Sequence, residues 1–296
     1  MIYNERTLSR RIGHKINSLL GENFIQWKVH FFSYFRKKEI VKEMKCAGPV
    51  FRNIEIETIN ICNGKCRFCP VSTISPHKRE IKVMEKEVFE KIIRDLSNMN
   101  YQGSIGLYSN NEPYIDQNIL SKMEYVRSFF PNNILYLYTN GSLLDYEKVK
   151  ISLKYLDRLV IDDYGRKNTS KKIQDIYEKL SESEKNKVDV YLRMEDELLN
   201  NRAGFAMNRS KMKKSLDAAC ACPFEQMVVR SDGHVSRCCN DALGKIDMGD
   251  VRKNTLLEIW ESDEYKSVRE KMLSGDRESI ELCKDCDSMI LHICEF

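Results

Sequence analysis

The 296-residue sequence contains no long apolar run. No stretch approaches the roughly 20 consecutive apolar residues of a membrane span, and the first residues, MIYNERTLSRRIGH, lack the apolar segment of a secretory signal. We therefore expect a cytoplasmic protein without a transmembrane segment. The formal net charge is only +4, so nothing in the charge predicts a nucleic-acid partner.

Cysteine is missing from the middle of the chain. Of the eleven cysteines, none lies between Cys69 and Cys220, whereas seven lie beyond residue 219. A disulfide framework is not expected in a chain without a secretion signal. Two separate groups of cysteines therefore indicate two separate metal centres. Cys46 stands apart, and we expect it to be a buried, inert thiol.

The first fifty residues have a helical pattern and most of the net positive charge. They contain ten Lys and Arg residues against four Glu. We interpret residues 1–50 as a helical extension packed on the main domain. Docking on an anionic surface or on a partner is the alternative interpretation.

From residue 54 onward, predicted strands and helices alternate. The strands are expected at 54–58, 104–109, 134–139, 158–163 and 188–193, and the helices at 85–99, 119–130, 146–156 and 171–181. Repeated β/α units predict an α/β fold with a parallel sheet or barrel. In such folds, ligands bind at the carboxyl ends of the strands, where polar clusters stand in this sequence.

The pattern changes after about residue 215. Residues 225–239 predict two short strands around a turn at Asp232-Gly233, and residues 255–273 predict a helix broken near Ser262-Asp263. We place the domain boundary within the polar stretch 200–219. The expected units are an extension at 1–50, a barrel at 51–215 and a small cysteine-rich domain at 216–296.

The first cysteine group has the spacing C-x3-C-x2-C, formed by Cys62, Cys66 and Cys69, with Phe68 just before the last cysteine. Zinc ribbons usually pair two C-x-x-C units to close a tetrahedral site. Three thiolates instead leave one iron of a [4Fe–4S] cluster free for another ligand. A closed zinc site that borrows a distant cysteine is the alternative.

This motif, placed after the first strand of a β/α fold, resembles the defining motif of the radical SAM superfamily. The resemblance implies a partial (β/α)6 TIM-like barrel and a [4Fe–4S] cluster held by Cys62, Cys66 and Cys69. It also implies that S-adenosyl-L-methionine binds the open iron and is cleaved to a 5′-deoxyadenosyl radical.

Further segments resemble cofactor-contacting motifs of the same superfamily. The segment SNNEP at 109–113 is similar to a Gly-Gly-Glu-Pro-like motif, with asparagines in place of the glycines, and YTNG at 138–141 follows the third strand. IDDYG closes the fourth strand, where ribose or substrate contacts are expected. The resemblance implies cofactor contacts from Asn110, Asn111, Glu112, Pro113, Thr139, Asn140 and Asp163.

The second cysteine group resembles the SPASM/twitch extension of radical SAM enzymes. The resemblance implies an auxiliary [4Fe–4S] cluster, in the one-cluster twitch form, held by Cys220, Cys238, Cys283 and Cys286. Cys222, Cys239 and Cys294 are then left over, and one of them could replace a chosen ligand. A structural zinc bound by four thiolates is the alternative.

In length and layout the chain resembles one-auxiliary-cluster dehydrogenases that oxidise an alcohol of an aminocyclitol. This resemblance implies a small, carbohydrate-like substrate and a flavodoxin- or ferredoxin-type reductant. Hydrogen abstraction would be followed by deprotonation and by electron transfer to the auxiliary cluster. The NRAG segment at 201–204 matches an N-R-x-G segment and makes Arg202 the substrate-contact candidate. The possible bases are Arg202, Arg193, Tyr191 and Asp162.

Three other functions stay open from the sequence. A sugar epimerase would need a hydrogen donor, for which Cys222 and Cys239 are candidates. A peptide- or protein-modifying enzyme is the second alternative, although residues 1–50 look too short for a leader-binding domain. The third, from another class, is a non-catalytic metal-bound interaction or electron-transfer protein.

Overall fold

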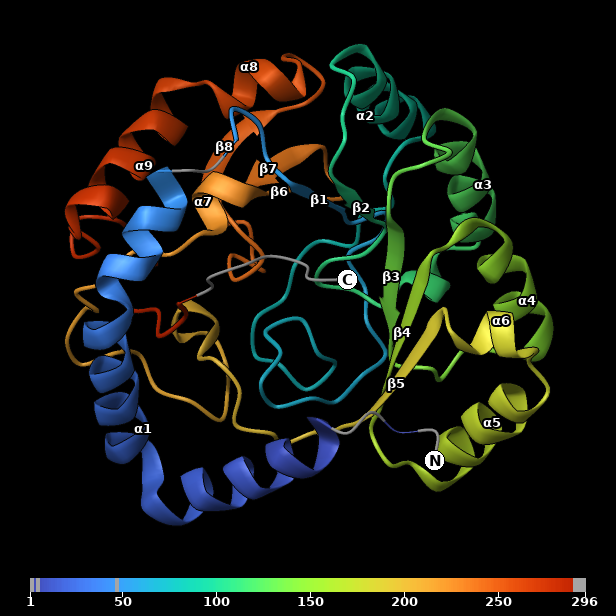
Figure 1. The fold of residues 1–296 in the computed structure, drawn as a ribbon, viewed down its shortest axis with the longest axis horizontal. Helices are drawn as coiled ribbons and strands as arrows, with labels where there is room; N and C mark the ends of the chain where they lie inside the picture. Colours follow the sequence, from blue (N-terminus) through green and yellow to red (C-terminus); the bar gives the residue numbers. More distant parts are fainter. Residues whose placement is uncertain (1–2, 4–5, 46–47, 290–296) are drawn as a thin grey trace.

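The computed structural model describes residues 3, 6–45 and 48–289. Cys46 and Cys294 lie outside the described residues. The described part of the chain is organised around one eight-stranded sheet with the order β5-β4-β3-β2-β1-β6-β7-β8. Figure 1 shows this sheet curving around an inner loop, with helices α2 to α5 on its outer side.

The predicted strands are all present, each within a few residues of its expected bounds. The first six strands pair in parallel, and the last two pair antiparallel. These observations confirm the α/β class and the hairpin after residue 225. The strand bounds are β1 Asn53–Ile56, β2 Ser104–Gly106, β3 Leu135–Thr139, β4 Arg158–Asp163, β5 Val188–Leu192, β6 Gln226–Val229, β7 His234–Ser236 and β8 Asp247–Asp250. Strand β8 was not predicted, because it is short and contains only one apolar side chain, Met248.

The sixth parallel strand comes from the C-terminal region and lies beside β1 instead of β5. Asn53 is in register with Gln226, and Ile56 with Val229. Both strands are buried along their whole length, so each is suited to a central position in the sheet. The sheet therefore runs without a break from the barrel into the cysteine-rich C-terminal region.

The predicted helices are also present. Their bounds are α1 Arg6–Lys45, α2 Lys86–Asn98, α3 Ile119–Phe129, α4 Tyr146–Tyr155, α5 Lys167–Glu178, α6 Glu182–Lys185, α7 Cys222–Glu225, α8 Leu256–Trp260 and α9 Asp263–Ser274, with short 3-10 turns at Pro113–Ile115 and Arg202–Gly204. The break expected near Ser262 separates α8 from α9. Among the described helices, none is both long and apolar enough to cross a membrane.

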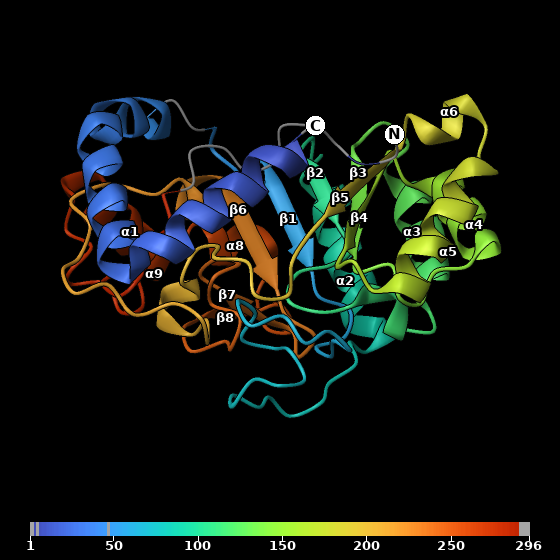
Figure 2. The same cartoon turned by 90° about the horizontal axis from the view of Figure 1, so that it is seen from below.

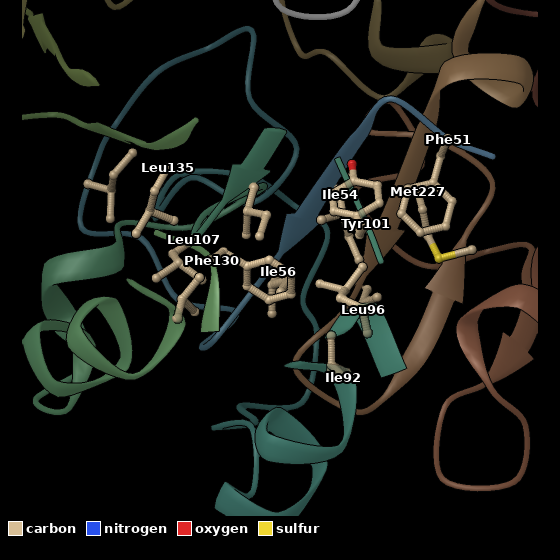
Figure 3. Packing of buried hydrophobic residues seen from close by; sticks show 14 of the residues in the cluster. Phe51, Ile54, Ile56, Ile92, Leu96, Tyr101, Leu107, Phe130, Leu135 and Met227 are labelled. Atoms are coloured by element: carbon tan, nitrogen blue, oxygen red, sulfur yellow. The ribbon is translucent and has the colours of Figure 1, made fainter. Parts of the chain in front are cut away.

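The core between β1 and α2 fixes which way the side chains of β1 point. Ile54 and Ile56 are fully buried together with Ile92 and Leu96 of α2, as Figure 3 shows. Because side chains alternate between the two faces of a strand, Glu55 must point to the inner face of the sheet. The apolar packing on the outside therefore places a carboxylate inside.

Helix α1 packs on the segment that joins the barrel to the C-terminal region. Gln26 Nε2 donates to the carbonyl of Lys211 at 3.1 Å, and Arg209 forms an ion pair with Glu22 at 2.9 Å. The helix is interrupted at Gly21, which has a φ of 76°. Figures 1 and 2 show α1 bending around the side of the molecule between β5 and α9.

Candidate active site

A cavity of about 350 Å³ lies at the carboxyl ends of strands β1 to β5. Its wall combines strand ends, the loop that follows β1 and the linker near residue 202. The structure brings most of the predicted site residues together here: Cys62, Cys66, Cys69, Asn110, Asn111, Glu112, Thr139, Asn140, Asp162, Arg193 and Arg202.

Three of the residues predicted for catalysis or cofactor binding do not line the cavity. Asp163 is fully buried on the other side of β4, where it accepts hydrogen bonds from the hydroxyl groups of Tyr3 at 2.9 Å and Ser170 at 2.8 Å. Pro113 is buried at the start of the 3-10 turn behind Glu112. Tyr191 on β5 is in register with Asp162 but is not part of the cavity wall. Through its two hydrogen bonds, Asp163 anchors Tyr3 and the start of α5.

A glycine lies close to two cysteines of the first group. A Cβ atom at Gly64 would lie 3.3 Å from Cys62 Sγ and 3.7 Å from Cys66 Sγ. The Gly64 N–H donates to Cys62 Sγ at 3.3 Å. Together with Cys69, these groups line the cavity. Three cysteines that line one cavity beside a glycine fit a cluster that is held by three protein ligands.

Burial raises the pKa of these thiols. The pKa of Cys62 and that of Cys66 rise to about 12, and the pKa of Cys69 is raised as well. Three thiolates close together in a low-dielectric site are costly unless a cation neutralises them. Iron ions would supply that charge and would displace the protons on binding.

Glu112 joins the loops that follow β2 and β3. Its carboxylate accepts hydrogen bonds from Thr139 Oγ1 at 2.7 Å, from the Asn140 N–H at 2.8 Å and from the Tyr114 N–H at 3.2 Å. Burial raises the pKa of Glu112. Asn140 Nδ2 in turn donates to Asn63 Oδ1, beside the first cysteine, at 2.8 Å. Glu112 therefore orients the two loops that flank the cysteines.

Asn111 provides a donor that no described residue uses. Its Oδ1 accepts from the Ser109 N–H at 3.0 Å, whereas its Nδ2 is buried without a hydrogen-bond partner among the described residues. Buried polar atoms without partners are uncommon in folded proteins. Because Asn111 lines the cavity, its free donor is suited to a bound ligand.

Arg202 reaches the cavity from a strained segment of the linker. Arg202 and Ala203 have φ values of 50° and 53°, which non-glycine residues adopt only at a cost. The Arg202 Nη1 atom donates to the Cys239 carbonyl and to Asn240 Oδ1, both at 3.3 Å. Its Nε atom has no partner in the described part of the chain. A strained backbone thus holds a guanidinium with an available donor at the cavity wall.

Asp162 and Arg193 form a second charged group in the wall. Asp162 Oδ1 lies 3.1 Å from Arg193 Nε, and Glu197 Oε1 lies 3.3 Å from Arg193 Nη1. Burial alone would lower the pKa of Arg193, but the two carboxylates raise it above its ordinary value. Arg193 therefore remains positively charged. It can donate hydrogen bonds but cannot accept a proton as a base would.

Glu55 is a cavity residue that the sequence interpretation missed. Its carboxylate accepts from Ser109 Oγ and from Gln226 Nε2, both at 2.7 Å. Burial raises its pKa to about 7, although the Ser109 hydrogen bond and the charge of Arg202 oppose the rise. The alternation of Ile and Glu in residues 54–57 was the available signal, because it places two carboxylates on one face of a central strand.

The second cysteine group lies beyond Arg202, in the C-terminal region. Cys238, Cys283 and Cys286 line a small cavity of about 20 Å³, and Cys220 is buried. Arg277 is 1% exposed and donates to the carbonyls of Cys283 and Cys286. A buried guanidinium beside several thiols would compensate the negative charge of a thiolate-held cluster.

Cys222 lies among the other C-terminal thiols. Hydrogen bonds with Cys220, Cys238 and Cys239, together with burial, raise its pKa well above the usual range. Cys239 differs, because it also lines the large cavity. No three Cys, His, Asp or Glu side chains among the described residues form a site for a single metal ion. A [4Fe–4S] cluster does not require such a site, because each iron takes one thiolate.

Comparisons with known proteins agree with this arrangement. The sequence profile of the radical SAM superfamily matches residues 56–200, and that of the SPASM iron-sulfur cluster-binding domain matches residues 220–287. The chain belongs to the radical SAM superfamily. It is a radical SAM enzyme that uses S-adenosylmethionine and iron–sulfur clusters, as the sequence predicted. The assignment of individual cysteines to each cluster stays a prediction.

Among its relatives is the S-adenosyl-L-methionine-dependent 2-deoxy-scyllo-inosamine dehydrogenase of Niallia circulans. The two are 26% identical over 241 residues, which cover 81% of this chain and 94% of that protein. The crystal structure of BtrN with AdoMet and 2-DOIA has a TM-score of 0.73 at 23% identity, over 83% of this chain and 97% of that chain. The structure of anSMEcpe with bound AdoMet has a TM-score of 0.57 at 16% identity, over 81% and 86%. These structural matches show the shared fold.

Proposed function

We propose that this enzyme oxidises a secondary alcohol of a small aminocyclitol or carbohydrate to a ketone. The observation that carries the proposal is the position of Arg202. It lines the large cavity and donates to the carbonyl of Cys239, which is adjacent to the predicted cluster ligand Cys238. A substrate in this cavity would therefore lie near the auxiliary cluster. Such a position favours an oxidation in which the auxiliary cluster accepts the second electron. The relative from Niallia circulans is named for an oxidation of this class.

The two clusters and S-adenosylmethionine would supply hydrogen-atom abstraction and an acceptor for the remaining electron. Cys62, Cys66 and Cys69 would hold the first cluster, and Cys220, Cys238, Cys283 and Cys286 the second. The protein itself must bind the substrate, orient its carbinol carbon and exclude water from the radical. The cavity of about 350 Å³ suits a small molecule.

Glu55 is the proposed acceptor of the hydroxyl proton. A carboxylate with a pKa of about 7 is matched to proton transfer near neutral pH. Arg202, with a free Nε donor, would orient the hydroxyl group. The alcohol then loses one hydrogen atom from carbon, one proton to Glu55 and one electron, which together give a ketone. Arg193 is less suited to the base role because it is paired with Asp162 and Glu197.

A flavodoxin- or ferredoxin-type protein would supply the reducing electron. Eleven cysteines and oxygen-sensitive clusters are best maintained in a reducing compartment, so the proposal includes a cytoplasmic location.

The proposal is tested by an oxygen-free assay with 2-deoxy-scyllo-inosamine and related aminocyclitols, followed by measurement of 5′-deoxyadenosine and ketone. Equal amounts of both products, with deuterium transferred from the carbinol carbon to 5′-deoxyadenosine, support it. Cleavage of S-adenosylmethionine without any ketone from the whole panel contradicts it. Activity on peptides instead would favour the peptide-modifying alternative.

A redox-neutral epimerase is the second candidate, because Cys239 is one of the residues that line the cavity. Such an enzyme would return a hydrogen atom from Cys239 to the substrate radical. Reaction in deuterated water separates the two candidates: an epimerase incorporates solvent deuterium at carbon, and Cys239→Ala abolishes this. If Cys238 is the cluster ligand, as predicted, a dehydrogenase keeps its activity in Cys239→Ala, since the backbone carbonyl that Arg202 contacts is unchanged.

A further inference from the structure

Helix α1 carries most of the exposed apolar side chains of the described residues. Fifteen large apolar side chains are exposed in the described part of the chain, and nine of them lie on this helix: Ile12, Ile16, Leu19, Leu20, Trp27, Phe31, Phe32, Tyr34 and Phe35. Single exposed apolar residues are normal, but a contiguous group indicates an interaction surface. The proposed alcohol oxidation makes no use of this group.

The second half of α1 bears a row of neighbouring aromatic rings, of which two pairs are stacked and one pair is edge-on. The ring centroids of Phe24 and Trp27 are 5.8 Å apart, those of Trp27 and Phe31 are 5.4 Å apart, and those of Phe31 and Phe35 are 4.8 Å apart. Spacings of three and four residues place these four side chains on one face of the helix. We call Phe24, Trp27, Phe31 and Phe35 the aromatic row.

The aromatic row faces away from the protein. The buried residues of the same helix segment are Ile25, Gln26, Ser33, Ile40 and Met44, and their spacing puts them on the side of the helix away from the aromatic row. Trp27 and Phe35 are 58% and 65% exposed. Packing of these rings therefore adds little to the stability of the folded chain. Their exposure to water is unfavourable unless a partner covers them.

The first half of α1 continues the same pattern with aliphatic side chains. Ile12, Ile16, Leu19 and Leu20 recur at helical spacing and are all exposed. Gly21 then breaks the helix. Both halves of α1 thus present an apolar face outward.

Basic residues accompany the apolar faces. Residues 11–45 contain eight Lys and Arg against three Glu. Lys38 and Lys42 follow Phe31 and Phe35 by seven residues each, so they extend the aromatic row along the same face. Aromatic and aliphatic side chains with Lys and Arg are the composition of helices that lie in the interface of anionic bilayers.

We propose that α1 docks on the surface of an anionic lipid bilayer, with the aromatic row and the neighbouring aliphatic side chains in the interface. The helix lies on the bilayer and does not cross it, since no described helix is suited to span a membrane. A second copy of this chain fits less well, because a parallel two-fold pairing of the aromatic rows would place Lys38 and Lys42 beside the same lysines of the other copy.

The test uses the full-length, cluster-loaded protein and sedimentation with vesicles. Binding is expected with vesicles that contain phosphatidylglycerol, and it should be weaker with pure phosphatidylcholine and at high salt. Trp27 emission should shift to shorter wavelength on binding. The other tryptophan, Trp260, is 3% exposed and should contribute an unchanged background.

Variants identify the face responsible. The triple change Trp27→Ala, Phe31→Ala and Phe35→Ala should weaken vesicle binding about tenfold or more, and Lys38→Glu with Lys42→Glu about fivefold or more for each lysine. Matched controls are Phe129→Ala, which removes an exposed ring from α3, and Lys154→Glu with Lys171→Glu, which change exposed lysines on α4 and α5. The controls should bind as the parent does.

Two results would overturn the proposal. One is the absence of vesicle binding by the parent, or binding that the controls lower as much as the α1 variants do. The other is a dimer in solution that the triple aromatic variant converts to a monomer, because the face would then belong to a second copy. Unchanged cleavage of S-adenosylmethionine by every variant shows that the fold is intact in each comparison.

Discussion

Asn201 and Asp287, which are 86 positions apart, exchange two hydrogen bonds. The Asn201 N–H donates to Asp287 Oδ1 at 2.8 Å, and the Asp287 N–H donates to Asn201 Oδ1 at 3.2 Å. Asn201 Nδ2 also donates to the carbonyls of Ser210 and Asp285. Since Asp287 follows Cys286 directly, Asn201 ties the segment that presents Arg202 to the C-x-x-C loop of the C-terminal region.

Replacing Asn201 by Ala is expected to uncouple these segments. The loss of several buried hydrogen bonds should lower the free energy of unfolding by about 1–3 kcal/mol, measured with urea. The strained backbone at Arg202 and Ala203 should relax, so substrate turnover should fall while cleavage of S-adenosylmethionine persists. Asn254→Ala, at an exposed position, is the control. Equal stability of the two variants would contradict the role assigned to Asn201.

Glu55 predicts a dependence of activity on pH. Its pKa is raised to about 7, and only the ionised form accepts a proton. The value of kcat/KM should therefore decrease as the pH falls through about 7 and reach a plateau above it. Glu55→Gln should be slow at every pH and lack this titration. A profile that is unchanged in Glu55→Gln would assign the base to another residue.

The same pKa predicts that Glu55→Gln, which should lower activity, raises the stability of the protein at high pH. A carboxyl group whose pKa is raised by folding stabilises the protein fully below its unfolded pKa of about 4.5. This contribution is lost as the pH rises through about 7. At pH 8 the metal-free Glu55→Gln protein should therefore be more stable than the parent by about 1–3 kcal/mol, with no difference below pH 4.5. Urea unfolding at both pH values measures this, and Glu87→Gln on the surface is the control.

Gly64 is expected to be necessary for the first cluster. A methyl group at this position would approach Cys62 Sγ to 3.3 Å and Cys66 Sγ to 3.7 Å, and would crowd two of the predicted ligands. Gly64→Ala should lose about four of about eight irons after reconstitution, together with S-adenosylmethionine cleavage. Gly48→Ala should keep all of them, because the nearest atom to its Cβ would be 3.9 Å away. Full iron content in Gly64→Ala would show that the cluster lies elsewhere.

The sequence predicted the strands and helices well because their apolar residues recur with the periods of the core. The spacing of the apolar residues matches the side that is buried, as it does for Ile54 and Ile56 and for Ile92 and Leu96. The position of β6 beside β1 could not be predicted in this way, because a pairing between Asn53 and Gln226 depends on which of several buried strands meet in space.

Site residues that belong to a short local motif were visible in the sequence. Residues that only the fold brings to the cavity were missed. The spacing of Cys62, Cys66 and Cys69 is local, so it is visible in the sequence. The pKa of Glu55 is raised chiefly by burial, and the two groups that bind its carboxylate, Ser109 and Gln226, come from distant segments. Asp163 has the same residue type and neighbourhood as Asp162, yet strand alternation points it away from the cavity. A pair of adjacent acids at a strand end does not reveal which one faces inward.

Single substitutions decide between the candidate ligands of the auxiliary cluster. Alignment on the C-x-x-P element makes Cys220 the ligand, whereas the thiol of Cys222 interacts with Cys220, Cys238 and Cys239. If Cys220 is the ligand, Cys220→Ala should retain about four irons and Cys222→Ala about eight. The reverse result would assign the ligand to Cys222.

A variant with Cys62, Cys66 and Cys69 all changed to Ala separates the two clusters: about four irons should remain in it. If that variant instead holds no iron and one zinc, the C-terminal site binds zinc. The electron acceptor would then be missing, and hydrogen return from Cys239 would become the favoured chemistry.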